Sequence, residues 1–472
     1  MRNEEAVWTI VDRHREAFER LSDAVFDTPE TNFNEIRSAC AHAAMLREHG
    51  FRVTENVAGI ETAMMGEAGE GGPVIAILGE YDALPGLVQQ SGATSHTPLP
   101  GDGAGHGCGH NLLGAGAMLA ATAVKDYLAQ HGLPGRVRYY GCPAEEGGSG
   151  KTFMVRDGAF EGVDIAITWH PMPFPGVNPA RSLANVMVDF SFTGRSSHAA
   201  AAPHLGRSAL DAVELMNVGV NYMREHMPSS ARIHYATLDA GGVAPNVVQG
   251  HARVRYMIRA ETLPEVLALE ARVRKIADGA ALMTECKVAA RNIAGMSNLV
   301  GNAPLEQALQ ASLERLGVPD WDAADREFAE QIRATLQPED VVAHYRHVGF
   351  PPRSDEVLPE RIVPLGQKGE PMMGSTDVGD VSWVVPLVQA DGPTQTIGAP
   401  HHSWQYTAHG KTALAKKGMV YTAKAMAATA LEALQNPALV AAAKAELAER
   451  TGGQPYTCPI PAEVKPPRPN GW

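Results

Sequence analysis

The chain has 472 residues, 44% of them apolar and 20% charged, so it can bury a large core and is expected to divide into more than one domain. The formal net charge of -13, without a run of Lys and Arg interleaved with aromatic residues, argues against nucleic acid as a partner. We find neither the apolar core of a signal peptide nor a window that approaches a membrane span. We therefore expect a cytoplasmic protein with no membrane contact.

The first half of the sequence alternates helical and strand-like patterns. Helical periodicity predicts two surface helices within the first sixty residues, the second ending near Gly50. Apolar runs then predict buried strands, with an alanine-rich helix between the first two. The strands are expected at 73–78, 137–140, 163–168 and 384–389, and the helix at 112–129. This alternation is typical of an α/β fold, a mostly parallel sheet flanked by helices.

The pattern changes at about residue 185. Apolar and polar residues alternate along 186–192 and 252–259, which predicts half-exposed antiparallel strands. Two helical stretches, 208–225 and 263–282, separate them, so we expect a two-layer α+β domain inserted into the first domain. The predicted division is 1–184 and 295–472 for one domain and 185–294 for the inserted one. Within the last part, 321–372 is predicted to be an elaborated surface insertion, and the proline-rich tail from Gly452 is predicted to be extended.

A short segment brings a thiol and an imidazole together. Cys108 and His110 are bracketed by glycines, and a loop of that kind can turn both side chains toward one ion. The alternative interpretation of Cys108 is a small buried apolar residue. The five scattered cysteines, Cys40, Cys108, Cys142, Cys286 and Cys458, favour reduced thiols over disulfides, and only Cys108 has neighbours suited to a metal.

Polar residues follow each predicted buried strand. Ligands gather at the carboxyl ends of strands in open α/β sheets, so these residues are expected to form one site. They are Glu80 and Asp82, then Glu145 and Glu146, then His170, then His401 and His402. The adjacent glutamates suggest one metal ligand and one residue that moves protons, although a solvated acidic pair is the common alternative.

Several motifs in order resemble the dinuclear metallopeptidase family that contains carboxypeptidase G, bacterial aminoacylases and plant auxin-conjugate amidohydrolases. The motifs are GEYDALPGL (79–87), GHGCGHNLLG (105–114), GCPAEEGG (141–148), WHP (169–171), GRSSHAAAAPHLGRSALDA (194–212), GGVAPNVV (241–248), GSTDVGDVS (374–382) and HHSWQ (401–405). The resemblance implies a catalytic domain with two divalent metal ions, an inserted lid domain that also forms a homodimer, and hydrolysis of an amide bond.

The resemblance also implies roles for single residues. Cys108 would bridge both ions, with His110 and His170 on one ion and Glu146 and His402 on the other. Glu145 would be the general base. Asp82 and His106 would lie behind the ligands. His401 would lie behind them or be exposed, because adjacent residues of an extended segment point to opposite sides. Glu80 stands where many relatives have a histidine, and Asn111 where many have an aspartate.

The lid segment is expected to contribute substrate contacts. By resemblance, His198, Asn246 and Arg259 reach the site of the partner subunit, so a monomer would be nearly inactive. Arg259 would grip a carboxylate, Asn246 would donate a neutral hydrogen bond, and His198 would donate to the developing oxyanion. The alternative interpretation is that Arg259 is simply an exposed residue of a strand.

The sequence leaves the metal and the substrate open. Thiolate and imidazole suit zinc, while manganese, cobalt or nickel are also compatible with the carboxylate ligands. The expected substrate is an N-acyl amino acid of the p-aminobenzoyl-glutamate type, a small molecule; other acyl amino acids or a dipeptide fit the same residues. The competing hypotheses are a hydrolase in which Cys108 is the nucleophile and His110 the base, and a non-catalytic metal-binding relative.

Overall fold

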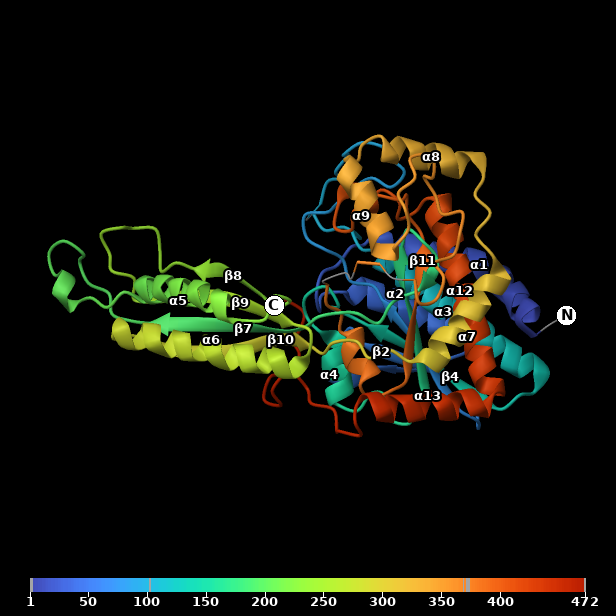
Figure 1. The fold of residues 1–472 in the computed structure, drawn as a ribbon, viewed down its shortest axis with the longest axis horizontal. Coiled ribbons are helices and arrows are strands. Elements are labelled where there is room, and N and C mark those ends of the chain that lie inside the picture. The colour runs from blue at the N-terminus through green and yellow to red at the C-terminus, as the bar shows by residue number, and fades with distance from the viewer. Residues whose placement is uncertain (1–2, 102, 368, 371–373, 471–472) are drawn as a thin grey trace.

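The computed structural model describes residues 3–101, 103–367, 369–370 and 374–470. The chain forms two parts, a broad α/β body and an elongated arm that projects from one side of it (Figure 1). Each part is built on its own sheet, and the arm has an apolar core separate from those of the body.

The body is built on a seven-stranded sheet with four parallel strands at its centre. The strands, in spatial order, are β1 (Arg52–Glu55), β2 (Met64–Glu70), β4 (Gly135–Cys142), β3 (Val74–Glu80), β5 (Ile165–Met172), β11 (Leu387–Pro393) and β6 (Gly176–Val177). Strands β4, β3, β5 and β11 pair in parallel, whereas β1–β2, β2–β4 and β6–β11 are antiparallel pairs. The predicted mostly parallel α/β sheet is confirmed, although its antiparallel edge strands were not expected.

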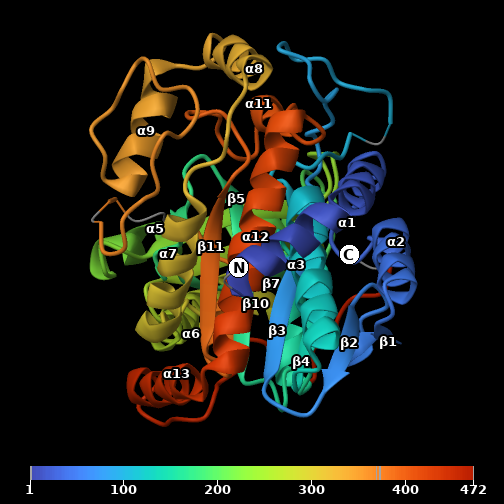
Figure 2. The ribbon, with the colours of Figure 1, turned by 90° about the vertical axis from the view of Figure 1, so that its right-hand side faces the viewer.

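Helices cover both faces of this sheet. On one face, α1, α3 and α12 lie in front of the strands (Figure 2), with α2 and α7 beside them and α13 along the end. Their bounds are α1 (Asn3–Phe26), α2 (Ile36–Glu48), α3 (His110–His131), α7 (Ala303–Leu316), α12 (Ala413–Gln435) and α13 (Pro437–Arg450). The other face packs against α4 (Gly150–Arg156), α10 (Val378–Ser382) and the short turn η1 (Val57–Gly59). Helix α1 buries seven apolar side chains because it packs on α3 and α12: Val7, Ile10, Val11, Phe18, Leu21, Val25 and Phe26.

Helix α3 is long and apolar enough to cross a membrane by length and composition, and it is the one such helix among the described residues. The expectation that no window approaches a membrane span is wrong on those criteria. However, 83% of the window is buried in the body, as in the core helix of a globular domain.

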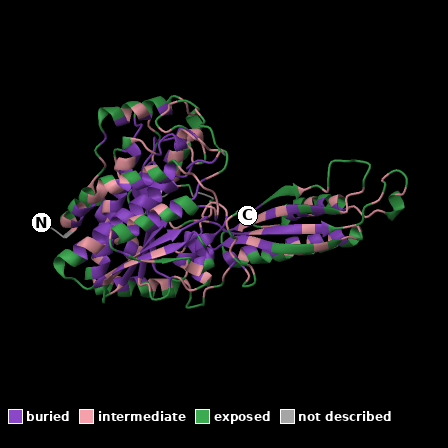
Figure 3. Ribbon diagram, turned by 180° about the vertical axis from the view of Figure 1, so that it is seen from behind, coloured by how far each residue is buried: buried purple, intermediate pink, exposed green. Residues whose placement is uncertain are grey.

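The arm is a two-layer α+β unit. Its antiparallel sheet has the order β10 (Lys287–Met296), β7 (Ala184–Thr193), β9 (His251–Ala260) and β8 (Arg232–Asp239). Helices α5 (Ala209–Met223) and α6 (Leu263–Met283) cover one face, against side chains such as Val188, Phe190 and Ile258. Burial is concentrated between these two layers, and the loops at the far end are exposed (Figure 3). The predicted inserted α+β layer pair is therefore confirmed.

Residues 321–372 are more than a surface insertion. They contain α8 (Ala323–Arg333) and α9 (Pro338–Val348), two helices that were not predicted from the sequence. Tyr345 and Val348 of α9 pack against Phe174 and Ile397 of the body, which anchors this segment above the carboxyl ends of the strands. The short helix α11 (Trp404–Thr407) follows the two histidines, and the described tail beyond Gly452 has neither helix nor strand, as predicted.

Candidate functional site

A tight turn directly before α3 places the thiol. Gly109 precedes α3 with φ of 75°, in the left-handed region that favours glycine. A Cβ atom at Gly109 would lie 2.6 Å from the Tyr406 hydroxyl and 3.1 Å from the Pro171 ring, so the close approach also requires glycine. The turn directs Cys108 and His110 into the space above the strands.

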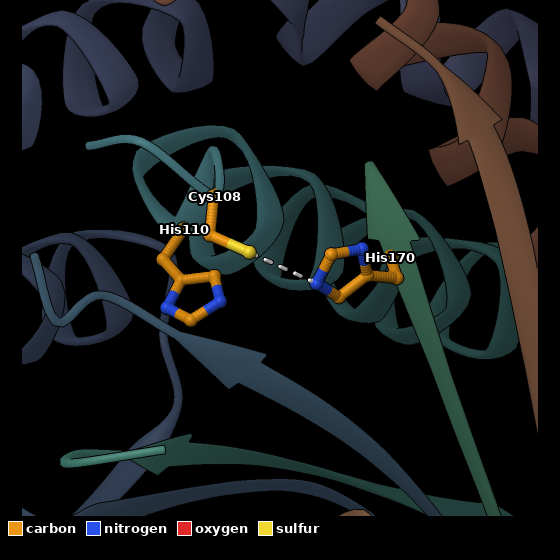
Figure 4. A group of neighbouring side chains, drawn as sticks. All are labelled: Cys108, His110 and His170. Carbon is orange, nitrogen blue, oxygen red and sulfur yellow. Dashed lines mark hydrogen bonds between the residues drawn. The ribbon is translucent and has the colours of Figure 1, made fainter. Parts of the chain in front are cut away.

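Cys108, His110 and His170 form one group of potential metal ligands (Figure 4). One donor atom from each lies within 4.8 Å of the others, and Cys108 Sγ is 3.5 Å from His170 Nε2. His170 Nδ1 lies 2.9 Å from the carbonyl oxygen of Pro171, which fixes the ring so that Nε2 faces the thiol.

A second group shares the same thiol. It consists of Cys108, Glu146 and His402, again with donor atoms within 4.8 Å of one another, and His402 Nε2 is 3.3 Å from Glu146 Oε2. His402 has a positive φ of 59°, and its N–H donates to Gly107 O at 2.9 Å. His401 has a different partner, with Nε2 3.0 Å from Pro171 O. The segment is a turn and not extended as expected, because His402 has a left-handed backbone.

A third group consists of Glu80, His110 and Glu145. Glu145 follows Ala144, which has φ of 59° and donates its N–H to the buried carboxylate of Glu35 at 2.9 Å. Burial, then Glu80 and Glu146, raise the pKa of Glu145 well above its ordinary value. A carboxyl group with a raised pKa holds a proton more readily than an ordinary carboxylate does, which suits a group that accepts a proton during a reaction.

Asp82 supports both sides of the site. Its Oδ1 lies 2.8 Å from His110 Nδ1, and its Oδ2 accepts the N–H of Glu146 at 2.9 Å. This contact leaves His110 Nε2 facing the ligand groups. Burial disfavours the charged imidazole of His110, but Asp82 and Glu80 outweigh burial and raise its pKa.

A buried ion network behind the site was not predicted. Lys151 Nζ lies 2.5 Å from Glu80 Oε1 and 2.6 Å from Asp377 Oδ1, and none of the three side chains is more than 3% exposed. The lysine offsets the negative charge that several carboxylates place in a dry environment. The sequence placed Glu80 near the site, but nothing local linked it to Asp377 or to Lys151, which follows the Gly-rich turn after Glu146.

His106 lies behind the loop and not among the ligand groups. Its Nε2 is 3.1 Å from the Val25 carbonyl oxygen, and its ring packs against Phe26. Burial lowers the pKa of His106 to about 4, so this ring is neutral and ties α1 to the site loop.

The residues present fit divalent cations. Among the described residues, Glu146 Oε1 is buried without a hydrogen-bond partner, and Glu80 Oε2 and His110 Nε2 are buried with only each other nearby, 3.2 Å apart. Burial, then Glu146, raises the pKa of the Cys108 thiol, so the uncharged thiol is favoured by the protein alone. A divalent cation reverses that preference, because a coordinating thiol is deprotonated outright.

The ligand groups open into a cavity of about 620 Å³. One end is lined by Cys108, Glu145, Glu146, His170 and His402. Its wall includes His347, Val348 and Val363 from the segment 321–372. That segment therefore shapes the cavity, which the sequence alone did not indicate.

The three predicted lid residues separate into two places. Arg259 stands at the base of the arm, where its guanidinium donates to Ser375 Oγ at 2.8 Å, next to the cavity wall. His198 and Asn246 are exposed and lie beyond the far end of the arm's sheet, beside each other through the hydrogen bond from Ala199 N to Asn246 O. Strand β7 runs about 30 Å from base to tip, so this chain does not bring those two to its own cavity.

A mostly parallel sheet, a cavity at its carboxyl ends and thiolate, imidazole and carboxylate donors together define a hydrolase of the metallopeptidase class. Residues 76–464 match the Peptidase family M20/M25/M40, and the chain belongs to this family. It is therefore an amide or peptide hydrolase.

The chain is similar in sequence to several named hydrolases. The chain is 46% identical over 467 residues to one subunit of the p-aminobenzoyl-glutamate hydrolase of Escherichia coli strain K12, with 97% of each chain covered. It is 29% identical to the Xaa-Arg dipeptidase of Mus musculus, with 92% of this chain and 90% of the relative covered. A homolog of a different subunit of p-aminobenzoyl-glutamate hydrolase, from Haemophilus influenzae, is 27% identical over 252 residues, 50% of this chain and 56% of the relative.

Solved structures share the fold. A dinuclear metal-binding M20 peptidase, the YXEP protein of Bacillus subtilis, superposes with a TM-score of 0.55 at 19% identity, covering 89% of this chain and 99% of that one. The aminobenzoyl-glutamate utilization protein of Klebsiella pneumoniae gives a TM-score of 0.52 at 18% identity, covering 69% of this chain and 89% of that one.

Proposed function

We propose that this chain hydrolyses the amide bond of an N-acyl amino acid of the p-aminobenzoyl-glutamate type, with two divalent metal ions and Glu145 as general base. The observation that carries the proposal is the sharing of Cys108 between two groups of potential ligands, Cys108–His110–His170 and Cys108–Glu146–His402. One thiolate common to two three-residue groups is the arrangement that a bridging ligand requires. Zinc or manganese is the expected metal, with cobalt or nickel also compatible.

The ions, when bound, would make a water in the site more acidic and polarise the amide carbonyl. Glu145 takes the proton of the attacking water and returns it to the leaving amine nitrogen. Asp82 keeps His110 and the backbone of Glu146 in place through its two hydrogen bonds, and Lys151 balances the charge of Glu80.

The amino-acid end of the substrate carries a carboxylate, which Arg259 is placed to bind. Its guanidinium is directed at Ser375 on the cavity wall, and burial lowers its pKa, so a bound carboxylate compensates for its desolvation. The exposed His198 and Asn246 complete a site only if a second arm reaches it, so we propose that the active form is at least a dimer.

The arm offers a surface for such an assembly. Strand β8 is an edge strand of the arm's sheet, and apolar side chains are exposed on it and on α5: Val218, Tyr222, Tyr235 and Leu238 are 50%, 77%, 41% and 40% exposed. A homodimer is the simplest assembly. The relative in Escherichia coli is named as one subunit of its enzyme, so a different but related chain is the competing partner. The proposed domain division is 1–184, 185–294 and 295–472, in which the middle segment is the arm. The cytoplasmic location stays a prediction from the sequence.

Hydrolysis by metal-free protein tests this proposal. The chelated protein is assayed on p-aminobenzoyl-glutamate, other N-acyl amino acids and Xaa-Arg dipeptides, before and after zinc or manganese is added back. Metal-dependent release of glutamate is the expected result. Turnover that survives chelation but is lost on thiol alkylation supports Cys108 as a nucleophile instead. Binding across the panel without turnover, under all metals, supports a non-catalytic relative.

A further inference from the structure

The cavity continues past the ligand groups along the edge of the large sheet. In the parallel pairing of β5 and β11, Asp391 is the register partner of His170, so both side chains leave the sheet on the same face about 5 Å apart. Gln389 lies two residues earlier in β11 and shares that face. Both β11 residues line the same cavity as His170 and Glu145. A substrate held at the ligand groups therefore has this strand beside it.

Asn178 joins the two β11 residues into one polar wall. Its Nδ2 donates to Asp391 Oδ1 at 2.7 Å, and its backbone N–H donates to Gln389 O at 2.9 Å. Asp391 is only 5% exposed, and no other hydrogen bond to its carboxyl comes from the described residues. Gln389 Oε1 is buried without any hydrogen-bond partner in the described part of the chain. Two acceptor oxygens that receive no hydrogen bond from the described residues, Asp391 Oδ2 and Gln389 Oε1, thus belong to residues on one wall of the cavity.

Apolar side chains line the same cavity as this polar wall, together with the charged Arg181, Glu306 and Arg450. Met172 and Val177 come from the sheet, and Val348 and Val363 come from the segment 321–372, which packs onto the body through Phe174. Val363 is further fixed by its N–H, which donates to Pro175 O at 2.9 Å. Apolar walls with a few placed polar groups are typical of a pocket for an amphipathic ligand.

We propose that Asp391 and Gln389 form the acyl-group subsite of this enzyme and select an aromatic acyl group that carries an uncharged hydrogen-bond donor, such as a ring amine, at its far end. This inference rests on the proposed function and specifies the substrate of the same site. An amine on an aromatic ring has two N–H donors, which match the two acceptors, while its ring fits between the apolar walls.

Unpaired acceptors are what give such a subsite its selectivity. A buried acceptor that finds no donor pays its full desolvation cost, so a substrate without the donor is disfavoured. The structural alternative is that Asp391 only holds β6 against β11 through Asn178.

The test compares two substrates of the same size. Wild-type protein, loaded with metal, is assayed on p-aminobenzoyl-glutamate and on p-methylbenzoyl-glutamate, which keeps the shape but lacks the donor. We expect kcat/KM to favour the amine by roughly 10- to 100-fold. Asp391→Asn and Gln389→Met are expected to reduce this ratio toward one, mainly by lowering kcat/KM for the amine. Asp278→Asn, an exposed aspartate on α6, is the matched control and should keep the wild-type ratio.

A wild-type ratio near one overturns the proposal, as does an equal loss on both substrates in Asp391→Asn, which indicates the structural role. Binding of p-aminobenzoate and p-methylbenzoate to the wild-type protein is measured by calorimetry in parallel, so that the subsite is tested without turnover or variants. Tighter binding of p-aminobenzoate supports the subsite even if neither amide is hydrolysed, and that outcome rejects the proposed function alone. Equal affinities reject the subsite.

Discussion

The two sheets of this chain differ in how helices cover them and in where they place polar residues. The strands β3, β4, β5 and β11 are covered by helices on both faces, so their polar groups emerge only at the carboxyl ends and converge there. The arm's sheet is covered by helices on one face, and its edge strand β8 pairs with a neighbour on one side. The residues proposed to bind substrate lie at the two ends of this sheet. A sheet covered on both faces concentrates reactive groups in a dry site at its carboxyl ends. A sheet covered on one face can carry residues away from that site, toward another chain. The following changes break or sharpen this contrast.

The largest effect is expected from the body. Glu145→Gln removes the proposed base but none of the ligands in the two Cys108 groups, so kcat should fall by about 10²- to 10⁴-fold while both ions remain bound. Initial rates and metal content by mass spectrometry measure the two quantities. Loss of metal along with rate would mean that Glu145 is a ligand, and an unchanged rate would remove it from the mechanism.

The arm is tested by His198→Ala. If His198 of one chain donates to the oxyanion in another, kcat should fall by about 10²- to 10³-fold. The variant should regain activity when it is mixed and reassembled with Glu145→Gln, because one of the two shared sites then has both residues intact. Activity of the mixed sample that equals the sum of the separate variants would contradict a site completed by a second arm.

Tyr222→Asp, on the exposed face of α5, should lower activity at low protein concentration by weakening assembly.

A smaller effect is expected from the residue that orients the ligands. Asp82→Asn disturbs the contacts with His110 Nδ1 and the Glu146 N–H, and should weaken metal binding by about 10- to 100-fold. Titration of the chelated protein with zinc measures this change. Asp278→Asn serves as the exposed control. Unaltered zinc affinity in Asp82→Asn would show that the hydrogen bonds do not hold the ligands.

The smallest effect concerns stability and pH. Burial, then Asp82, raises the pKa of Glu35 from 4.5 to about 8, so the folded state retains a proton that the unfolded state loses. The stability contributed by the neutral carboxyl is complete below pH 4.5 and is lost as pH rises to about 8. Glu35→Gln should flatten this decline while keeping the acceptor for Ala144 N–H. Urea denaturation of both proteins across that range measures it, and parallel curves would contradict the assignment.

Local patterns predicted most of the body and part of the site. Cys108 and His110 are close in sequence, and the strands before Glu145 and His170 are clear apolar runs, so their convergence followed from topology. Their metal-binding roles stay predictions. The Glu80–Lys151–Asp377 network could not be predicted because its members are far apart in sequence and nothing local to Lys151 indicates two buried carboxylate partners.

The same reason explains the cavity wall. Residues 321–372 are polar and rich in proline and glycine, and nothing local indicates that Tyr345 and Val348 pack on Phe174. Asp391 and Asn178 meet only because β6 folds back onto β11. Contacts of this kind depend on long-range pairing and cannot be inferred from periodicity.

The most direct test of the central claim is a crystal structure of the zinc-loaded protein with anomalous diffraction data. We predict two zinc peaks per chain, both bonded to Cys108 Sγ at about 2.3 Å, one with His110 and His170 and the other with Glu146 and His402. A single ion, or two ions that do not share Cys108, would contradict the account.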